Sequence, residues 1–333
     1  MGYNELDYLR GGLKMKTILA GIGSFGLGWY QTLKTRYPHI QVVVVDSNPA
    51  MARLLTDPAD RFYTDYVEAL DREQPDFVLN LTPPAVHTRL NHLAFDRRIP
   101  VLCEKPIAEA YSESVEIVAR AEREGIPFMI AENYRRLPVF RKARQLIEAG
   151  AVGTLSAVYV QFYKEAYFEK EYLLKMPEPL LVDVTVHHLD LLRYLTGQEG
   201  RRVFARSFNP RASRYPGNAA LNFLLEMQDG AVVSYAGSLA CQEAETIWAG
   251  EWRIQGTAGV LLAGESLRLV RGGAATIIDD LSDVDASGCL DEFLSALAQR
   301  REPESSGTDY LQTQKLVHYA QESIRQGCPV DIP

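Results

Sequence analysis

The 333-residue chain has no long apolar run, no closely spaced cysteines and no strongly basic tract. Without an apolar run of about 18 residues, no segment is expected to cross a bilayer. The four cysteines, Cys103, Cys241, Cys289 and Cys328, form no C-x-x-C pair, which disfavours disulfides and cysteine-rich zinc sites and fits a reducing cytoplasm. The net charge of −8 arises from interspersed charges of both signs, so nucleic acid is not an expected partner.

The composition that remains is that of a globular protein, with 47% hydrophobic and 23% charged residues. A chain of this length is expected to form two domains. Residues 1–14 are polar and lack the apolar core of a signal peptide, so we interpret them as an extension. We therefore expect a soluble, cytoplasmic protein whose first strand begins near Met15.

Between residues 15 and 133, short β-branched runs alternate with longer amphipathic ones. This alternation predicts βαβ units and a doubly wound parallel sheet, the Rossmann arrangement. The expected strands are residues 16–21, 41–46, 76–82, 100–105 and 127–132, and the expected helices are residues 24–36, 48–55, 84–97 and 111–125.

From residue 134 to residue 333 the pattern becomes rich in β-strands, after one helix that begins near Val139. A D-G pair at residues 229–230 predicts a hairpin, and the runs together predict an antiparallel sheet. Two closing helices are expected near residues 291–299 and 309–324. The expected strands are residues 154–164, 202–208, 219–227, 231–239, 251–257, 259–264 and 266–272.

A glycine-rich loop, "AGIGSFG", follows the first expected strand and precedes a helix. Gly21, Gly23 and Gly26 have the G-x-G-x-x-G spacing that places a pyrophosphate at a helix N-terminus, with Ser24 and Phe25 beside it. Asp46 ends the next strand 20 residues after Gly26, where a carboxylate binds an adenosine ribose. Because Asp46 would repel a 2′-phosphate, we predict NAD rather than NADP as the cofactor.

Two further loops follow strands at the edge of the sheet where ligands bind in open α/β folds. One contains Thr82, Pro83 and His87, and the other contains Glu104 and Lys105. We predict that these residues border the cofactor, with Lys105 near the nicotinamide. The alternative for Lys105 is a solvated surface lysine.

The segment "LVDVTVHHLDLLRYL" places two of the chain's six histidines and two aspartates in a helix-like apolar stretch. At about 100° per residue, Asp183, His187 and Asp190 share one stripe, and His188 lies at the edge of an apolar stripe. The three residues on the first stripe could bind a metal, form a structural pair or transfer protons. A zinc site needs a richer ligand set, so we predict no metal.

Taken together, these motifs resemble the family that includes glucose–fructose oxidoreductase and inositol dehydrogenase. The resemblance is carried, in order, by "AGIGSFG", "VVVVD", "NLTPPAVHTRL", "CEKPIA", "AENYRR" and the D-x-x-x-H-x-x-D pattern from Asp183 to Asp190. It implies a Rossmann domain over residues 15–133. It also implies a substrate-binding domain over residues 134–333 with an open-faced antiparallel sheet, which often mediates homodimer or homotetramer assembly.

The resemblance also implies hydride exchange between a nicotinamide and a sugar, polyol or related small molecule. It assigns Lys105, Asp183 and His187 to catalytic positions and places Tyr134 and Arg135 beside the substrate. One departure is Thr185, which stands where the family often has glycine; it leaves the particular sugar open. Tyr163, in a tyrosine-rich stretch, and His188 are further candidates for contact with substrate.

The chemistry requires a group that takes the hydroxyl proton as hydride leaves carbon. A histidine titrates near neutral pH and an aspartate can orient it, while a lysine can stabilise the alkoxide or act as the base. Whether Lys105 or His187 is the formal base stays open. Two other hypotheses are an NAD-dependent glycoside hydrolase that oxidises its sugar transiently and a non-catalytic dinucleotide sensor.

Overall fold

A computed structural model describes residues 15–169 and 171–333, and the chain divides into two compact units. The first unit contains the described residues up to Glu132 together with Gly288–Leu311. The second contains Asn133–Ser287 and Gln312–Pro333. The segment Gly288–Leu311 thus joins the first unit although it follows the β-rich region in sequence. The extension expected at residues 1–14 lies outside the described residues.

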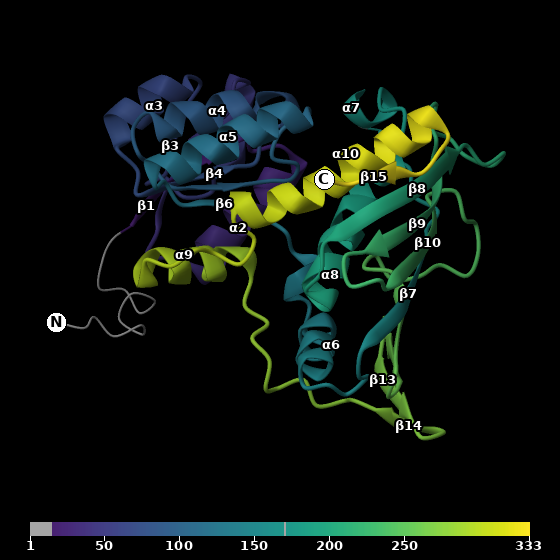
Figure 1. Ribbon diagram of the computed structural model, residues 1–333. Helices are drawn as coiled ribbons and strands as arrows, with labels where there is room; N and C mark the ends of the chain where they lie inside the picture. Colours follow the sequence, from purple (N-terminus) through teal and green to yellow (C-terminus); the bar gives the residue numbers. More distant parts are fainter. Residues whose placement is uncertain (1–14, 170) are drawn as a thin grey trace. The chain divides into compact units, whose positions relative to one another are not determined.

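The first unit contains a six-stranded sheet with the order β3-β2-β1-β4-β5-β6 (Figure 1). Every neighbouring pair is parallel, as the alternating βαβ pattern predicts. Its central strands are buried on both faces, which explains their continuous Val, Ile and Leu content. The strands are β1 (Lys16–Ala20), β2 (Gln41–Val45), β3 (Arg61–Tyr63), β4 (Phe77–Asn80), β5 (Val101–Cys103) and β6 (Phe128–Ile130).

Helices cover both faces of this sheet, so the doubly wound prediction is confirmed. Right-handed crossovers place α3, α4 and α5 on one face, and α2 lies on the other face with α9, as Figure 1 shows. Leu290, Phe293 and Leu294 of α9 join the apolar core formed with α2. The helices are α2 (Ser24–Arg36), η1 (Pro49–Leu54), α3 (Tyr66–Glu73), η2 (Pro84–Val86), α4 (His87–Phe95), α5 (Tyr111–Glu124) and α9 (Cys289–Gln299).

The second unit contains a nine-stranded sheet with the order β14-β13-β12-β11-β7-β10-β9-β8-β15. The strand pairs are antiparallel, as predicted, except that β7 and β10 pair in parallel, so the sheet is mixed. A helical connection follows β7, and such a connection allows parallel pairing. The strands are β7 (Leu155–Tyr163), β8 (Gly200–Phe208), β9 (Ala220–Met227), β10 (Val232–Ser238), β11 (Glu251–Gly256), β12 (Val260–Ala263), β13 (Leu267–Arg271), β14 (Ala274–Ile277) and β15 (Val330–Asp331).

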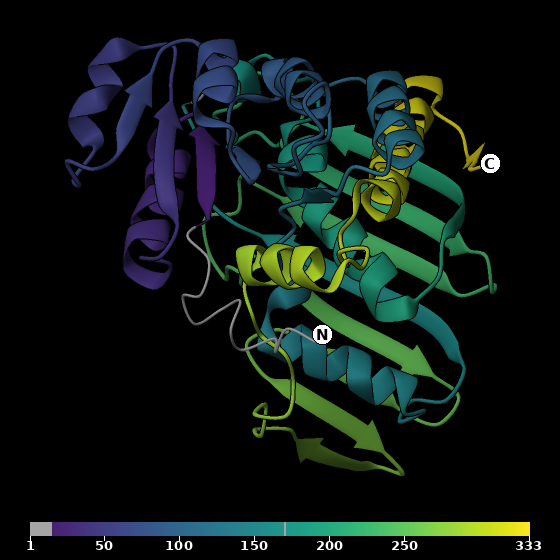
Figure 2. The same ribbon diagram turned by 90° about the vertical axis from the view of Figure 1, so that its left-hand side faces the viewer.

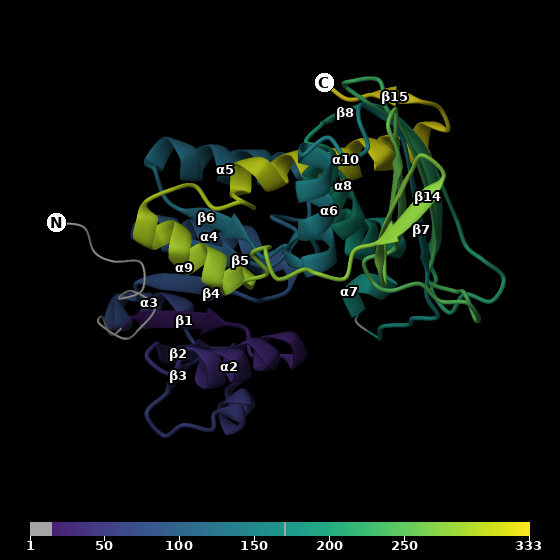
Figure 3. The same ribbon diagram turned by 90° about the horizontal axis from the view of Figure 1, so that it is seen from below.

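Among the residues that the structure describes, the helices of the second unit lie along one face of its sheet and none lies on the opposite face (Figures 2 and 3). Buried and exposed residues alternate along β8 and β9, so inward side chains form the core and outward ones stay exposed. The helices are η3 (Tyr134–Arg136), α6 (Pro138–Glu148), α7 (Glu171–Leu174), η4 (Leu180–Thr185), α8 (Val186–Thr196) and α10 (Gly307–Gln326), whose first turn belongs to the first unit.

Candidate active site

The glycine loop between β1 and α2 uses each of its three glycines differently. Gly21 has φ +89°, a conformation that side chains disfavour. A Cβ at Gly26 would lie 1.9 Å from the Gly21 carbonyl oxygen, so the turn closes only with glycine there. A Cβ at Gly23 would meet nothing within 4 Å, so the loop is open on that side.

The open side of this loop suits an anion. Gly23 is the N-cap of the 13-residue helix α2, no side chain caps that helix, and its first turn contains no acidic residue. A helix N-terminus carries partial positive charge and N–H groups directed outward, so the loop fits a pyrophosphate. The neighbouring Ser24 and Phe25 are exposed, the Phe25 side chain to 55%.

Asp46 follows β2 and fixes the glycine loop from the side. One carboxylate oxygen accepts the N–H of Ile22 at 3.0 Å, and the other accepts the N–H of Asn48 at 2.9 Å. Each carboxylate oxygen can accept more than one hydrogen bond, so Asp46 can also bind the two hydroxyls of a ribose. The loop thus offers N–H donors for the pyrophosphate, and the carboxylate offers acceptors for the ribose hydroxyls of a dinucleotide.

Thr82 and His87 lie in the segment that follows β4. The Thr82 hydroxyl donates to Asn80 Oδ1 at 2.6 Å, which fixes the exit of the strand. His87 is fully buried, and its two ring nitrogens lie 2.8 Å from the carbonyl oxygens of Thr82 and Pro106. The imidazole thus connects the loop after β4 with the loop after β5, while Pro83 is exposed.

The loop after β5 carries Glu104 and Lys105, both partly exposed. The N–H of Lys105 donates to Glu104 Oε2 at 3.3 Å. Desolvation is the main cause that raises the pKa of Glu104 to about 7, and the nearby Glu132 carboxylate raises it further, while Lys105 and Trp29 oppose the shift. A carboxyl that titrates near neutral pH therefore stands beside the candidate catalytic lysine.

In the second unit, the segment with the two histidines is not one continuous α-helix. It begins with the π-helical η4, where the N–H of Val186 reaches back five residues to the carbonyl of Leu181 before α8 starts. This wider turn shifts Asp183 relative to the residues of α8, which the 100° periodicity did not anticipate. Asp183 and His187 are partly exposed, as a residue that meets a ligand must be.

The ring of Tyr134 stacks on His187, with the ring centroids 4.6 Å apart. The same tyrosine ring lies 5.8 Å from that of His188. Tyr134 belongs to η3 and is the second residue of the second unit, which begins at Asn133. The structure thus brings together the predicted residues Tyr134 and His187 within one unit.

Arg135 and Asp190, from the same two helices as these rings, form a buried ion pair. Arg135 Nε donates to Asp190 Oδ2 at 2.8 Å, and the second guanidinium nitrogen contacts Oδ1, so the pair is bidentate. Thr313 of α10 donates to Asp190 Oδ1 at 3.0 Å. The side chains of Arg135 and Asp190 are 5% and 0% exposed, so the ion pair ties η3 to α8.

His188 is 1% exposed, and both of its ring nitrogens have partners. Nε2 lies 2.9 Å from the carbonyl oxygen of Trp248, and Nδ1 lies 3.0 Å from the hydroxyl of Tyr235. A carbonyl only accepts, so Nε2 carries the proton and Nδ1 accepts from Tyr235. The Tyr235 hydroxyl lies 3.0 Å from the Thr185 hydroxyl. Thr185, which stands where the family often has glycine, therefore belongs to this hydrogen-bond network.

An aromatic wall extends from these residues along the end of β7. Tyr163 is partly exposed, and its backbone N–H donates to Thr246 Oγ1 at 3.1 Å. The Tyr215 hydroxyl accepts the N–H of Phe168 at 3.0 Å. Burial raises the pKa of Tyr215, and the nearby Asp183 carboxylate raises it further. The sequence did not identify Trp248 or Tyr215, because both lie far along the chain from the motif segments.

Residues 15–132 match the oxidoreductase family with an NAD-binding Rossmann fold, and residues 140–262 match the GFO/IDH/MocA C-terminal domain. The chain belongs to the GFO/IDH/MocA oxidoreductase family. It is an NAD-binding oxidoreductase, as the glycine loop and the motif order predict.

Individual relatives of this family align with nearly the whole chain. D-apiose dehydrogenase of Rhizobium rhizogenes is 27% identical over 96% of this chain and 98% of its own. An oxidoreductase of Agrobacterium radiobacter, solved with NAD⁺, L-tartaric acid and magnesium, is 25% identical with a TM-score of 0.86 over 96% of this chain and 99% of its own. Levoglucosan dehydrogenase, solved with NADH and levoglucosan, shares the fold with a TM-score of 0.81 at 20% identity, over 96% and 99% of the two chains.

The described part of the chain, residues 15–169 and 171–333, contains neither a cluster of metal-ligating side chains nor a helix that could span a membrane. No group of three or more His, Cys, Asp or Glu side chains there could hold a metal ion. Asp190, which could be considered a ligand from the sequence, instead pairs with Arg135. No helix in the same residues is long and apolar enough to span a membrane.

Proposed function

We propose that this GFO/IDH/MocA oxidoreductase transfers hydride between NAD(H) and a secondary hydroxyl or carbonyl of a sugar, polyol or close derivative. The observation that carries this proposal is the partly exposed His187, stacked on Tyr134 in a unit whose relatives include a D-apiose dehydrogenase and a levoglucosan dehydrogenase. A small polyhydroxylated substrate suits a site with aromatic walls and a few polar groups.

In the oxidative direction, the bound nicotinamide accepts the hydride that leaves the substrate carbon. The hydroxyl proton of that carbon passes to His187 or Lys105, and the C–O bond becomes a carbonyl. Asp183 orients the imidazole and stabilises its charged form, and Lys105 stabilises the negative charge that develops on oxygen.

Several predicted residues support the reacting groups in this scheme. We propose that Gly21, Gly23, Ser24, Phe25 and Gly26 hold the pyrophosphate and Asp46 the ribose, and that Thr82, Pro83 and Glu104 border the nicotinamide half. His87 acts by joining the two strand-end loops. Tyr134 and Tyr163 contact substrate, whereas the buried Arg135 and His188 position the groups that do.

The test is a screen of sugars, polyols and lactones with NAD⁺ or NADH, followed by nicotinamide absorbance at a wavelength that distinguishes the two forms. Lys105→Ala and His187→Ala are each expected to abolish turnover while NADH binding is retained, with His39→Ala as the control. Wild-type turnover in either variant removes that residue from the mechanism. If no compound in the panel is turned over, the proposed substrate class is rejected.

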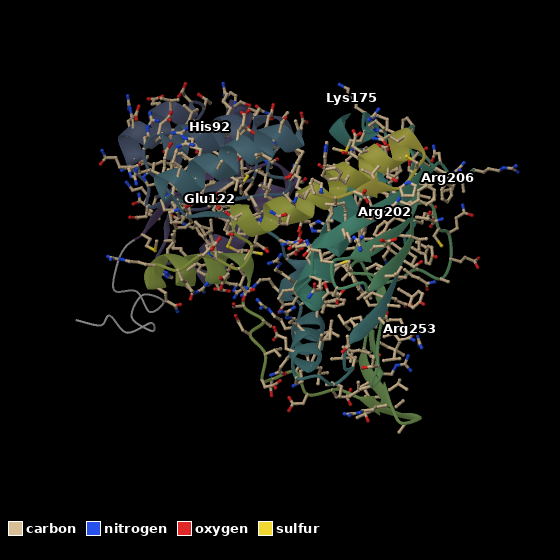
Figure 4. All side chains as sticks on the ribbon, in the orientation of Figure 1. His92, Glu122, Lys175, Arg202, Arg206 and Arg253 are labelled. Carbon is tan, nitrogen blue, oxygen red and sulfur yellow. The ribbon has the colours of Figure 1, made fainter. Side chains whose placement is uncertain are left out.

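We also propose that the face of the nine-stranded sheet without helices forms a homo-oligomer interface. Phe204, Leu224 and Tyr159 are 39%, 53% and 46% exposed, and Phe204 lies opposite Leu224 in the strand register. Arg202 and Arg206 lie two residues before and after Phe204 in β8, and Arg253 lies opposite Tyr159 in the strand register; Figure 4 labels the three arginines. Apolar side chains in a row on an exposed sheet are typical of an interface.

The assembly state tests this interface directly. Leu224→Asp is expected to convert the wild-type dimer or tetramer to a smaller species in size-exclusion chromatography with light scattering. Val67→Asp changes an exposed apolar residue of the first unit and serves as the control. A monomeric wild-type protein contradicts the proposal. For the cellular location we propose the cytoplasm, supported by the wide spacing of the four cysteines in the sequence, which form no C-x-x-C pair, and tested by fractionation.

A further inference from the structure

The loop between β10 and β11 contains an exposed tryptophan, Trp248, and hydrogen bonds hold the backbone on this part of the loop. The Trp248 side chain is 40% exposed, although burial of so large an apolar group stabilises a protein by about 2 kcal/mol or more. Its backbone carbonyl accepts a hydrogen bond from the buried His188 at 2.9 Å. Two residues earlier, the N–H of Thr246 donates to the Tyr163 carbonyl at 3.0 Å. The backbone around Trp248 is thus held by hydrogen bonds, while the residue stays accessible to a ligand.

The surroundings of the indole combine apolar and charged groups. Phe162 and Phe168 pack against it, with ring centroids 5.8 and 5.9 Å away. The Lys164 ammonium lies 5.8 Å from the centroid of the indole and 2.7 Å from Glu245 Oε2. An aromatic surface beside one donor and one acceptor suits the C–H face and the hydroxyls of a carbohydrate.

This platform belongs to the neighbourhood of His187 within the second unit. His188, which holds the Trp248 carbonyl, follows His187 directly, and the Tyr134 ring lies against both histidines. Phe162 also lies 5.0 Å from the His188 ring. A continuous series of ring contacts therefore links the candidate base to the exposed indole.

We propose that Trp248 stacks against the non-reacting part of the carbohydrate substrate, while Lys164 and Glu245 bind its hydroxyl groups. This inference rests on the proposed function, because it names the part of the same site that determines specificity. Trp248 thereby selects substrates with an extended C–H face, such as a pyranose or furanose ring, over short polyols like glycerol.

The experiment measures both turnover and binding for wild type, Trp248→Ala and Trp248→Phe, with Ile277→Ala as a control at another exposed apolar residue. For ring sugars that wild type oxidises, Trp248→Ala is expected to raise KM about tenfold and leave kcat and NADH affinity nearly unchanged. Trp248→Phe should restore most of the affinity, because it keeps an aromatic face. For glycerol, Trp248→Ala should have little effect.

Tryptophan fluorescence of the NADH-free protein on titration with the same sugars separates this inference from the proposed function. If no sugar is turned over but one causes a fluorescence change that Trp248→Phe abolishes, the stacking proposal stands and the proposed reaction fails. If a ring sugar is oxidised and Trp248→Ala keeps the wild-type KM, only the stacking proposal is overturned. If there is neither turnover nor a Trp248-dependent signal, both are rejected.

Discussion

Arg135 of η3 and Asp190 of α8 form a bidentate ion pair with almost no solvent exposure in the second unit. The pair joins the two helices that carry the stacked rings, because Tyr134 precedes Arg135 in η3 and His187 lies about one helical turn before Asp190 in α8. The position of both rings therefore depends on a charge interaction that no substrate needs to touch.

Removing one partner of this pair leaves the other charge buried and unpaired. Arg135→Ala or Asp190→Asn is expected to lower the free energy of unfolding by about 3–5 kcal/mol. Urea denaturation followed by circular dichroism measures the change. Arg325→Ala, which removes an exposed ion pair with Glu322, is the control and should cost less than about 1 kcal/mol. Equal effects at the two pairs would contradict the structural role of Asp190.

Gly26→Ala tests the close packing inside the dinucleotide loop. The added methyl would lie 1.9 Å from the Gly21 carbonyl oxygen, so the loop must open and NADH affinity should fall at least tenfold. Gly28→Ala is the matched control, because it lies in the same helix and its Cβ meets nothing within 4 Å. NADH fluorescence titration gives both affinities, and a Gly26→Ala protein that binds like Gly28→Ala would show that the loop is not used.

Asp46 is predicted to determine the choice between NADH and NADPH. Asp46→Ala removes the acceptor for a ribose hydroxyl and for the N–H groups of Ile22 and Asn48, so NADH affinity should fall about tenfold or more. NADPH affinity should change less, because a repulsive charge is lost at the same time. Parallel titrations with the two cofactors test this, and a wild-type protein that prefers NADPH would refute it.

Glu104 is expected to make stability depend on pH. Because burial raises the pKa of Glu104 from 4.5 to about 7, the folded state retains its proton where the unfolded state has lost it. This contribution is complete below pH 4.5 and is lost as the pH rises through 7. Glu104→Gln should therefore be progressively more stable than wild type between pH 5 and 8, by on the order of 2 kcal/mol. Chemical denaturation across this pH range measures the difference. The control, Glu109→Gln at an exposed residue, should show no such trend.

The sequence predicted the elements whose boundaries are set locally. Helix α2 begins and ends at the predicted residues 24 and 36, because the glycine loop fixes its start and the apolar positions fix its face. The sequence pattern predicts no helix or strand between residues 56 and 75, yet this region forms β3 and α3. The strand has only three residues, and α3 depends on Asp65, whose side chain caps the N–H of Glu68 at 2.8 Å.

Features that depend on tertiary contacts could not be predicted in this way. The π-helical turn of η4 changes the phase of a pattern that assumed 100° per residue, and Asp190 is fully buried although the same pattern placed it with the partly exposed Asp183 and His187. Trp248 acquires its place only when its carbonyl meets His188, 60 residues away in the chain. The spacing of apolar and polar residues within one segment contains no information on contacts with distant segments of the chain.

The parallel pairing of β7 with β10 delays the folding of the second unit during synthesis. Val232, the first residue of β10, follows Tyr163, the last residue of β7, by 69 positions, and the other neighbour of β7, β11, comes still later. During synthesis, β7 therefore leaves the ribosome before either of the strands that pair with it, β10 and β11. Such distant pairing slows folding, so the nascent chain exposes an unpaired apolar strand to chaperones until residues beyond Gly256 have been synthesised.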